Sequence, residues 1–185
     1  MGERSQIYVK VDGNLEVANY YQWNYGTRMI SRARYGIEWI YDMLKAEYPS
    51  AMQRRHFNFE AFRRIWDVNF DYKDMVISRD LIKEDPGYKD DLERFIYGQD
   101  NDDGILFVDV NTKTGKIKYC LTDCYEKNPM DAEQYMDWNC GDWKGDGQDT
   151  DEDYDTCMQN IQSIGEMAEL MTKGELDAFC RKESA

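Results

Sequence analysis

Several residue types and motifs that carry enzymatic chemistry are scarce or missing in this 185-residue chain. His56 is the only histidine, which excludes any Ser-His-Asp or Cys-His arrangement that does not use it. The sequence has neither a P-loop nor a G-x-G-x-x-G motif, so the common phosphate-binding and dinucleotide-binding loops are missing. We therefore expect no enzymatic activity and no cofactor.

Metal-binding patterns are also lacking. The five cysteines contain no CxxC pair, and their shortest spacing, Cys120–Cys124, fits no zinc pattern. Free thiols in a reducing cytosol are the simpler interpretation. The acidic loops Asp100–Gly104 and Asp142–Asp151 do not have the EF-hand spacing. No metal site is predicted, but 37 Asp and Glu residues leave open an alternative function as a metal-dependent hydrolase or nuclease that uses an acidic cluster.

Long apolar runs are the third absence. No stretch approaches the roughly 18 apolar residues of a membrane span, and the first ten residues lack the apolar segment of a signal peptide. A cytoplasmic protein of a bacterial host is therefore expected. Hydrophobic residues nevertheless make up 42% of the chain and aromatic residues 14%, which is enough for a well-buried core.

The hydrophobic pattern predicts a single α+β domain over residues 1–185, with a small antiparallel sheet built from β-hairpins and packed by two long helices and several short ones. One hairpin pairs Gln6–Val11 with Leu15–Tyr21 around Asp12-Gly13, and a second pairs Ile105–Asn111 with Lys116–Leu121. A short strand is expected at 74–78. Helices are expected at 28–48 with Thr27 as N-cap, 59–69, 88–97, 129–138 with Pro129 in the first turn, 152–171, and a last short one capped by Thr172 and Glu175.

Charge is the strongest global signal, with a formal net charge of −14. The two parts of the chain differ sharply, because residues 1–70 are near neutral (+2) whereas residues 71–185 carry a net charge of −16. Such a protein repels bare nucleic acid from its acidic part and attracts basic partners at a distance.

One tract, 131–155, concentrates this acidity. It holds ten carboxylates and one cation, with four large aromatic residues among them, whereas a purely solvating acidic segment has few aromatics. Carboxylates with aromatic anchors are suited to a cationic protein surface; an ordinary acidic loop between two helices is the alternative. The predicted partner-binding residues are Asp142, Asp146, Asp149, Asp151, Glu152, Asp153 and Asp155, with Trp138, Trp143 and Tyr154 as anchors.

Two basic clusters interrupt the less charged part. Arginines gather at the start of the first long helix, where positive charge opposes the helix dipole, and around the second helix. They suggest a secondary contact with nucleic acid or an acidic subunit, against the simpler interpretation of surface arginines. The candidates are Arg28, Arg32, Arg54, Arg55, Arg63 and Arg64.

Four blocks of the chain resemble blocks that recur in short proteins of gut Firmicutes genomes and their mobile elements, a largely uncharacterised family. They are MGERSQIYVKV, NYYQWNYGTRMISRARYGIEWI, DVNFDYKDMVIS and MDAEQYMDWN. Within that family the chain is similar to the type II anti-CRISPR proteins, phage-borne inhibitors of the RNA-guided Cas nuclease. The resemblance implies a single-domain inhibitor that blocks DNA binding or cleavage, and it transfers no functional residue, because no motif position is shared.

We therefore expect a non-enzymatic inhibitor that binds a basic nucleic-acid-processing protein. In this interpretation the carboxylates act as a DNA mimic by replacing phosphates, and the aromatic rings replace base stacking. The basic clusters depart from a pure DNA mimic and leave open a mode in which both nuclease and nucleic acid are contacted. The aromatic run Tyr20–Tyr25 and the charge difference between the two parts of the chain are compatible with a homodimer.

Overall fold

A computed structural model describes residues 3–46, 59–68, 75–78, 91–144 and 154–181. All described strands join one mixed sheet of six strands in the order β3-β2-β1-β4-β5-β6. The strands are β1 (Arg4–Val11), β2 (Asn14–Gln22), β3 (Met75–Ser78), β4 (Ile105–Asn111), β5 (Lys116–Thr122) and β6 (Glu169–Leu170). The predicted α+β class is confirmed.

The sheet contains the two predicted hairpins. It is a mixed sheet, however, and the prediction of a purely antiparallel sheet was wrong. In the first turn Asp12 and Gly13 both have positive φ, 50° and 87°, as the two-residue turn that matches strand twist requires. The hairpins meet along β1 and β4, which run parallel. β5 and β6 are also parallel. Strand patterns show which residues pair within a hairpin, whereas the orientation of one hairpin against the other depends on the connecting segments.

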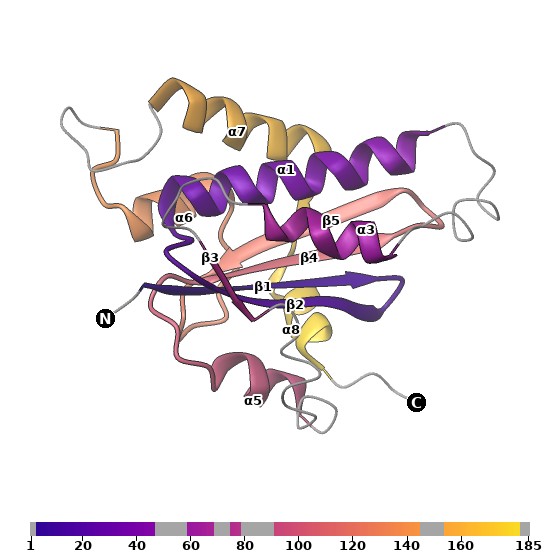
Figure 1. The fold of residues 1–185 in the computed structure, drawn as a ribbon, viewed down its shortest axis with the longest axis horizontal. Coiled ribbons are helices and arrows are strands. Elements are labelled where there is room, and N and C mark those ends of the chain that lie inside the picture. Colours follow the sequence, from indigo (N-terminus) through magenta and orange to yellow (C-terminus); the bar gives the residue numbers. More distant parts are fainter. Residues whose placement is uncertain (1–2, 47–58, 69–74, 79–90, 145–153, 182–185) are drawn as a thin grey trace.

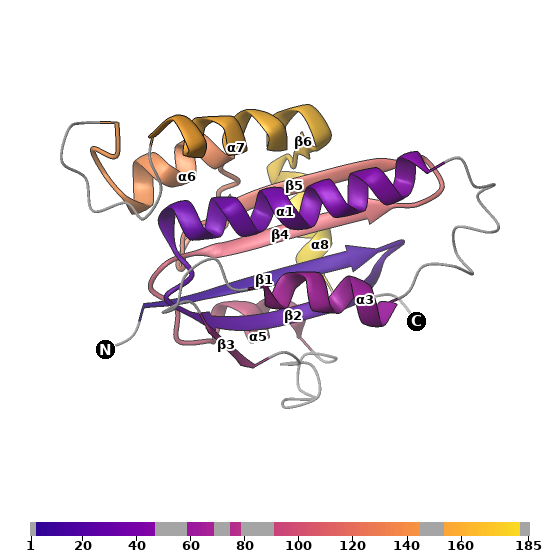
Figure 2. The ribbon, with the colours of Figure 1, turned by 45° about the horizontal axis from the view of Figure 1, so that its top comes forward.

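Helices cover both faces of the sheet (Figures 1 and 2). One face carries α1, α3, the 3₁₀ helix η1, α6 and α7, and the other carries α5 and α8. The first group is α1 (Gly26–Lys45), α3 (Phe59–Arg64), η1 (Ile65–Asp67), α6 (Ala132–Asn139) and α7 (Tyr154–Met167). The second group is α5 (Leu92–Tyr97) and α8 (Lys173–Cys180). None of the described helices is both long and apolar enough to span a membrane.

The strand alternation divides the core into two layers. Val9 and Leu106 face α1, whereas Tyr8 and Phe107 face α5 and α8, and all four are fully buried. Tyr8 and Phe107 lie on the face of the central strands opposite α1. Because α5 and α8 cover that face, both sides of the central strands are buried.

Several helix ends differ from the prediction, and among the described helices α1, with 20 residues, is the longest, followed by α7 with 14. Its N-cap is Tyr25, which makes no side-chain cap bond, and the predicted cap Thr27 is buried in the first turn. α6 begins after Asp131, which forms a capping box with Gln134, so Pro129 lies before the helix. α7 ends at Met167, because the following residues pair with β5 as β6. The predicted Thr172–Glu175 capping box of α8 is confirmed.

Candidate protein-interaction surface

The acidic tract that the sequence singled out lies only partly within the described residues. Asp142 and Asp155 are exposed, and the Tyr154 side chain beside Asp155 is 46% exposed. Their role in binding a partner stays a prediction. The other predicted contact carboxylates, Asp146, Asp149, Asp151, Glu152 and Asp153, fall outside the described residues.

Trp143 is not an exposed anchor, contrary to the prediction. Its side chain is only 3% exposed, its indole Nε1 donates to Asp137 Oδ1 at 2.8 Å, and its ring packs against Tyr154 at 5.6 Å between centroids. Lys144 Nζ lies 2.7 Å from Glu133 and 3.4 Å from Asp137. Trp143 therefore anchors the middle of the 131–155 tract to the core, and Lys144 neutralises part of the charge of Glu133 and Asp137.

The arginines at the start of α1 are also placed differently from the prediction, because they are buried. Arg32 is fully buried, where its Nε donates to Asn24 Oδ1 at 2.9 Å and its Nη1 to the Trp66 carbonyl at 2.6 Å. Arg28 is 3% exposed and donates to the Trp23 carbonyl at 3.1 Å. Neither offers a surface to nucleic acid. Both arginines donate hydrogen bonds to oxygen atoms in the core. The sequence alone does not show where these acceptors lie, and so it could not explain why arginines stand at the helix start.

The second basic cluster is partly neutralised within the chain. Arg63 Nη2 lies 2.8 Å from Glu16 Oε2, and Arg64 Nη2 lies 2.5 Å from Glu60 Oε1. Both arginines are exposed, so their contact with nucleic acid stays a prediction. Arg54 and Arg55 lie outside the described part of the chain.

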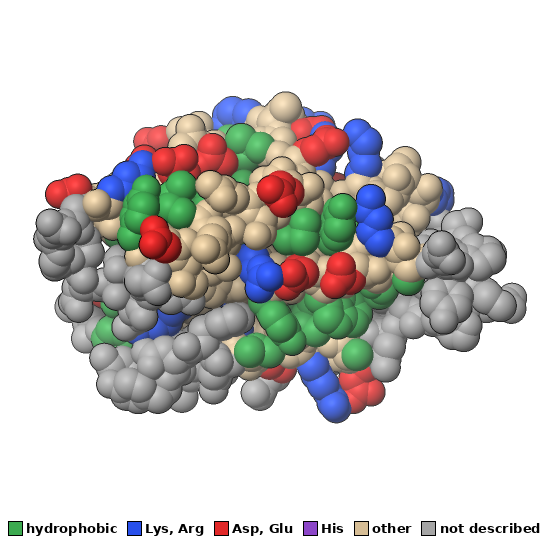
Figure 3. All heavy atoms as spheres, turned by 90° about the horizontal axis from the view of Figure 1, so that it is seen from above, with side chains coloured by type: hydrophobic (Ala, Val, Ile, Leu, Met, Phe, Trp, Pro, Cys, Tyr) green, Lys and Arg blue, Asp and Glu red, His purple; other side chains and the backbone are tan. Residues whose placement is uncertain are grey.

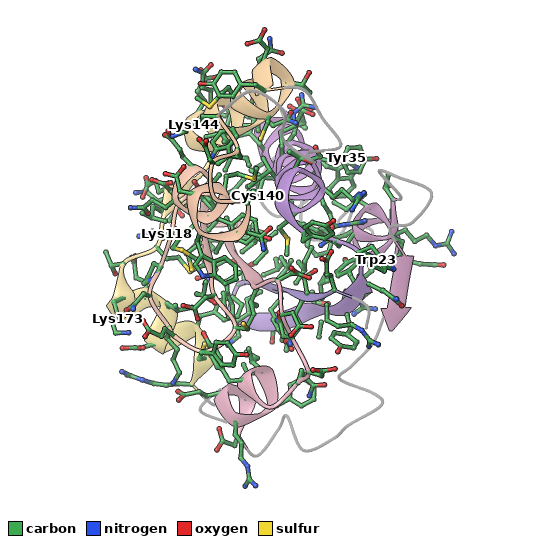
Figure 4. The ribbon with its side chains drawn as sticks, turned by 90° about the vertical axis from the view of Figure 1, so that its left-hand side faces the viewer. Trp23, Tyr35, Lys118, Cys140, Lys144 and Lys173 are labelled. Carbon is green, nitrogen blue, oxygen red and sulfur yellow. The ribbon has the colours of Figure 1, made fainter. Side chains whose placement is uncertain are left out.

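A second acidic and aromatic surface lies where β4 begins and β5 ends, and of its residues sequence reasoning had singled out only Trp138 as a contact. The 98–104 loop before β4, the 123–129 loop after β5 and the last turn of α6 meet at this end of the sheet. Figure 4 faces this end, with Trp23 and Cys140 labelled on it. We call it the acidic loop surface, and its residues are Asp100, Asp102, Asp123, Tyr125, Glu126 and Trp138.

Local hydrogen bonds hold these two loops in shape. Asn101 Oδ1 accepts from the backbone N–H groups of Asp103 and Gly104 at 3.0 and 2.9 Å. Asp123 Oδ1 accepts from the N–H of Tyr125 at 2.7 Å. Gly104 has φ +92°, and a Cβ there would lie 3.2 Å from the Trp138 ring, which places that ring against the 98–104 loop. The surface is thus built on a fixed backbone.

Tyr125 joins the two loops electrostatically. Its side chain is 83% exposed, and that of Trp138 is 39% exposed. The pKa of the Tyr125 phenol is raised, first by the neighbouring Cys124 thiol and also by the carboxylates of Asp102 and Asp100. An exposed aromatic ring therefore stands within the field of carboxylates from a loop about 20 residues earlier in the chain.

A buried carboxyl lies beneath this surface. Asp103 is 7% exposed, and Asn139 Nδ2 donates to its Oδ1 at 3.4 Å. Burial first, and then the charge of Glu3, raise the pKa of Asp103 to about 7. Its backbone carbonyl accepts a hydrogen bond from the Tyr135 hydroxyl at 2.8 Å. The loop that carries Asp100 and Asp102 is therefore tied to the core through its buried neighbour.

Other surfaces are less one-sided in charge. On the face formed by α7 and α1, acidic side chains alternate with basic ones and with apolar patches (Figure 3). At the opposite end of the sheet, a cavity of about 530 Å³ is lined by residues that include Lys10, Asp109, Lys118 and Glu175. Lys10, Asp109 and Lys118 are register neighbours across β1, β4 and β5, and Lys118 pairs with Glu175. Opposite charges thus largely balance inside this cavity.

The described residues offer little for nucleophilic or multi-ligand metal chemistry. Within them, no three His, Cys, Asp or Glu side chains are grouped so as to hold a metal ion. Burial raises the pKa of the Cys140 and Cys180 thiols to about 11, which disfavours the reactive thiolate. His56 lies outside the described part of the chain.

Comparison with known proteins adds no assignment, since no family model, curated protein or solved structure matches this chain.

Proposed function

We propose that this protein is a non-enzymatic inhibitor that binds a basic nucleic-acid-processing protein through the acidic loop surface. The RNA-guided Cas nuclease is the first partner to test, because its nucleic-acid channel is positively charged and the chain resembles anti-CRISPR proteins. In that role the carboxylates would occupy phosphate positions, and the exposed rings would replace base stacking.

The observation that carries the proposal is the exposure of Tyr125 and Trp138 among carboxylates at one end of the sheet. Large aromatic side chains lose stability by facing water, and they are the residues that dominate binding energy at protein interfaces. Here Asp123 holds the turn that presents Tyr125, and Gly104 permits the close approach of Trp138. An ordinary solvated loop has no need for either arrangement.

The charge of the chain supports the same function. A net charge of −14 steers association toward basic surfaces and keeps bare nucleic acid away. Binding of this kind weakens as salt screens the charges. We therefore expect the affinity for the nuclease to fall steeply between about 0.05 M and about 0.5 M salt.

The direct test removes charge from the surface without changing its shape. The site variant combines Asp100→Asn, Asp102→Asn and Glu126→Gln, which are near-isosteric replacements. Asp123 is kept, because its carboxylate holds the turn before Tyr125. The matched control removes three exposed charges elsewhere, with Asp42→Asn, Glu60→Gln and Glu166→Gln.

Both variants have the same net charge, so a general loss of steering affects them alike. We expect the site variant to bind a Cas nuclease about tenfold more weakly or worse, a loss of about 1.4 kcal/mol, and the control to stay within about threefold of the parent chain. Tyr125→Ala should weaken binding by a similar factor. If the site variant and the control bound with equal affinity, the proposal that the acidic loop surface contacts the nuclease would be rejected.

A third variant tests the tract outside the described residues. If the 131–155 tract is the contact, we expect charge reversal of four of its acids to lower affinity more than tenfold with the fold intact. A loss seen only in this variant would show that the tract, and not the acidic loop surface, binds the partner. A plasmid-interference assay with several guide-directed nucleases, with and without the chain, shows whether inhibition occurs at all. Light scattering decides whether the active species is a dimer.

A further inference from the structure

The cavity at the turn end of the sheet is large enough for a small organic molecule. Its volume is about 530 Å³, within the roughly 300–1,000 Å³ of ligand sites in proteins. Strands β1, β4 and β5 form its floor, the 111–115 turn forms one wall, and α8 forms the other. In Figure 1, α8 lies on the side of the sheet away from α1. None of the residues of the acidic loop surface lines this cavity.

Lysine is concentrated around this cavity. Four of the eight lysines in the described part of the chain line it, in a protein whose net charge is −14. They are Lys10, Lys113, Lys116 and Lys118. Three carboxylates line it as well, those of Asp12, Asp109 and Glu175. With four cations against three carboxylates, the lining carries one net positive charge, whereas the chain as a whole is strongly acidic.

The charges inside the cavity balance, and the two inner lysines already have partners. Lys10 is 6% exposed, and its Nζ lies 5.0 Å from the Phe179 ring centroid. Asp109 is its register neighbour on β4. Lys118, the register neighbour of Asp109 on β5, pairs with Glu175. An anionic ligand would therefore gain little from these two lysines.

The rim of the cavity is different, because its lysines are less engaged. Lys113 forms no ion pair with any residue that the structure describes. Lys116 pairs with Glu169 at 3.2 Å, but both side chains are more than half exposed, and such a pair contributes little. The carboxylate of Asp12 accepts from the N–H and the hydroxyl of Thr112 at 2.9 and 2.5 Å. The ammonium groups of Lys113 and Lys116 are therefore available to a ligand.

The turn that carries these two lysines is held in a fixed shape. Asn111 Oδ1 accepts from the N–H groups of Lys113 and Thr114 at 3.1 and 3.0 Å. The Gly115 N–H donates to the Asn111 carbonyl at 2.9 Å, and Gly115 has a φ of 69°, which glycine adopts without strain. Lys116 follows as the first residue of β5. Two cations thus stand three residues apart on an ordered hairpin turn.

We propose that this cavity binds a small phosphate monoester, with the phosphate held at the rim by Lys113 and Lys116. Lysine binds phosphate as a point charge, and no arginine, whose fork suits planar bidentate recognition, is among the described lining residues. The organic part of the ester would enter the cavity beside Met171 and Ala178, which line it. The site does not rest on the proposed function, because it lies at the other end of the sheet from the acidic loop surface.

The test titrates the full chain by isothermal titration calorimetry with AMP, phenyl phosphate and inorganic phosphate, and with adenosine as the uncharged control. Constant ionic strength keeps the general screening of the acidic chain equal in every titration. The site variant combines Lys113→Gln with Lys116→Gln. The matched control combines Lys45→Gln with Lys173→Gln, which removes two exposed lysines that do not line the cavity. Ala178→Met leaves the charge unchanged and fills the cavity from α8.

We expect at least one of the two esters to bind with a Kd below about 1 mM, and adenosine not to bind. The site variant should bind that ester about tenfold more weakly or worse, and the control should stay within about twofold of the parent. Glu169→Gln, which releases Lys116 from its pair, should strengthen binding by about twofold. Ala178→Met should weaken binding of the ester by about fivefold or more. The stronger of AMP and phenyl phosphate shows which organic part the cavity accepts.

Three outcomes would overturn the proposal. The first is that neither ester binds below about 10 mM, or that adenosine binds as well as AMP. The second is that the site variant and the control lose the same affinity, which would indicate an effect of net charge alone. The third is that Ala178→Met binds both esters as the parent does, which would place the organic part outside the cavity.

Discussion

Replacement of Arg32 should reduce stability more than replacement of any exposed arginine in the described part of the chain. The guanidinium is fully buried, donates to Asn24 and to the Trp66 carbonyl, and lies 4.5 Å from the Tyr21 ring centroid. Arg32→Ala removes these bonds and takes the donor from Asn24 Oδ1, whereas the Trp66 carbonyl keeps the bond from the Tyr21 hydroxyl at 2.9 Å. A hydrogen bond to a charged group contributes about 1.5–3 kcal/mol, and truncating a large buried side chain costs about 2–5 kcal/mol.

Because these costs overlap, we expect Arg32→Ala to lose about 4 kcal/mol of unfolding free energy. That is a large part of the roughly 5–15 kcal/mol that holds a typical domain folded. Arg32→Lys keeps the charge and loses the planar fork, so a loss of about 2 kcal/mol is expected. Arg64→Ala is the control, since its exposed pair with Glu60 contributes roughly 0.3–0.5 kcal/mol.

Equilibrium urea unfolding, followed by tryptophan fluorescence, measures these differences directly. The order expected for the loss is Arg32→Ala, then Arg32→Lys, then Arg64→Ala. If the unfolding free energy of Arg32→Ala stayed within about 1 kcal/mol of the parent's, the description of a buried network around Arg32 would be wrong. The surface role that the sequence suggested would then be the better interpretation. If instead Arg32→Ala does not fold, Arg32→Lys still distinguishes a core position from a surface one.

Two smaller changes test other parts of the fold. Gly36→Ala should cost about 2 kcal/mol by thermal melting, because a Cβ there would lie 2.3 Å from the buried Trp66 ring, whereas Gly165→Ala, with open space at that position, should be neutral or stabilising. The pKa of Glu175 is lowered to about 2, first by its bond to Lys118. Its contribution to stability is therefore present above pH of about 4.5 and is lost as pH falls toward about 2. Solvent exposure keeps that contribution below about 1 kcal/mol, which the pH-dependent difference between the parent and Glu175→Gln measures; a difference that grew on acidification would contradict it.

Sequence reasoning was accurate where the interactions are local. The strand Ile105–Asn111 and the Asp12-Gly13 turn follow from alternation and from the turn geometry that those residues allow. The capping box of α8 likewise needs only Thr172 and Glu175. These features depend on residues a few positions apart, and so the sequence contains the information needed to predict them.

Features that depend on distant contacts could not be predicted in this way. The parallel pairing of β1 with β4 joins residues about 100 positions apart. A run of acids in the sequence drew attention to 131–155, whereas the acidic loop surface is assembled from separate loops with only a few carboxylates each. Density of charge along a chain is therefore a poor guide to density of charge in space.

The buried charged groups at this end of the molecule differ in how they are compensated. Arg32 donates to two neutral acceptors, Asn24 Oδ1 and the Trp66 carbonyl, while the Asn24 amide donates to Ser5 Oγ at 3.0 Å. Glu3 and Asp103 each keep an oxygen without a partner among the described residues. Because burial first raises the pKa of Asp103 to about 7, a proton removes the charge of that carboxyl near neutral pH, whereas Arg32 is compensated by hydrogen bonds to Asn24 and to the Trp66 carbonyl.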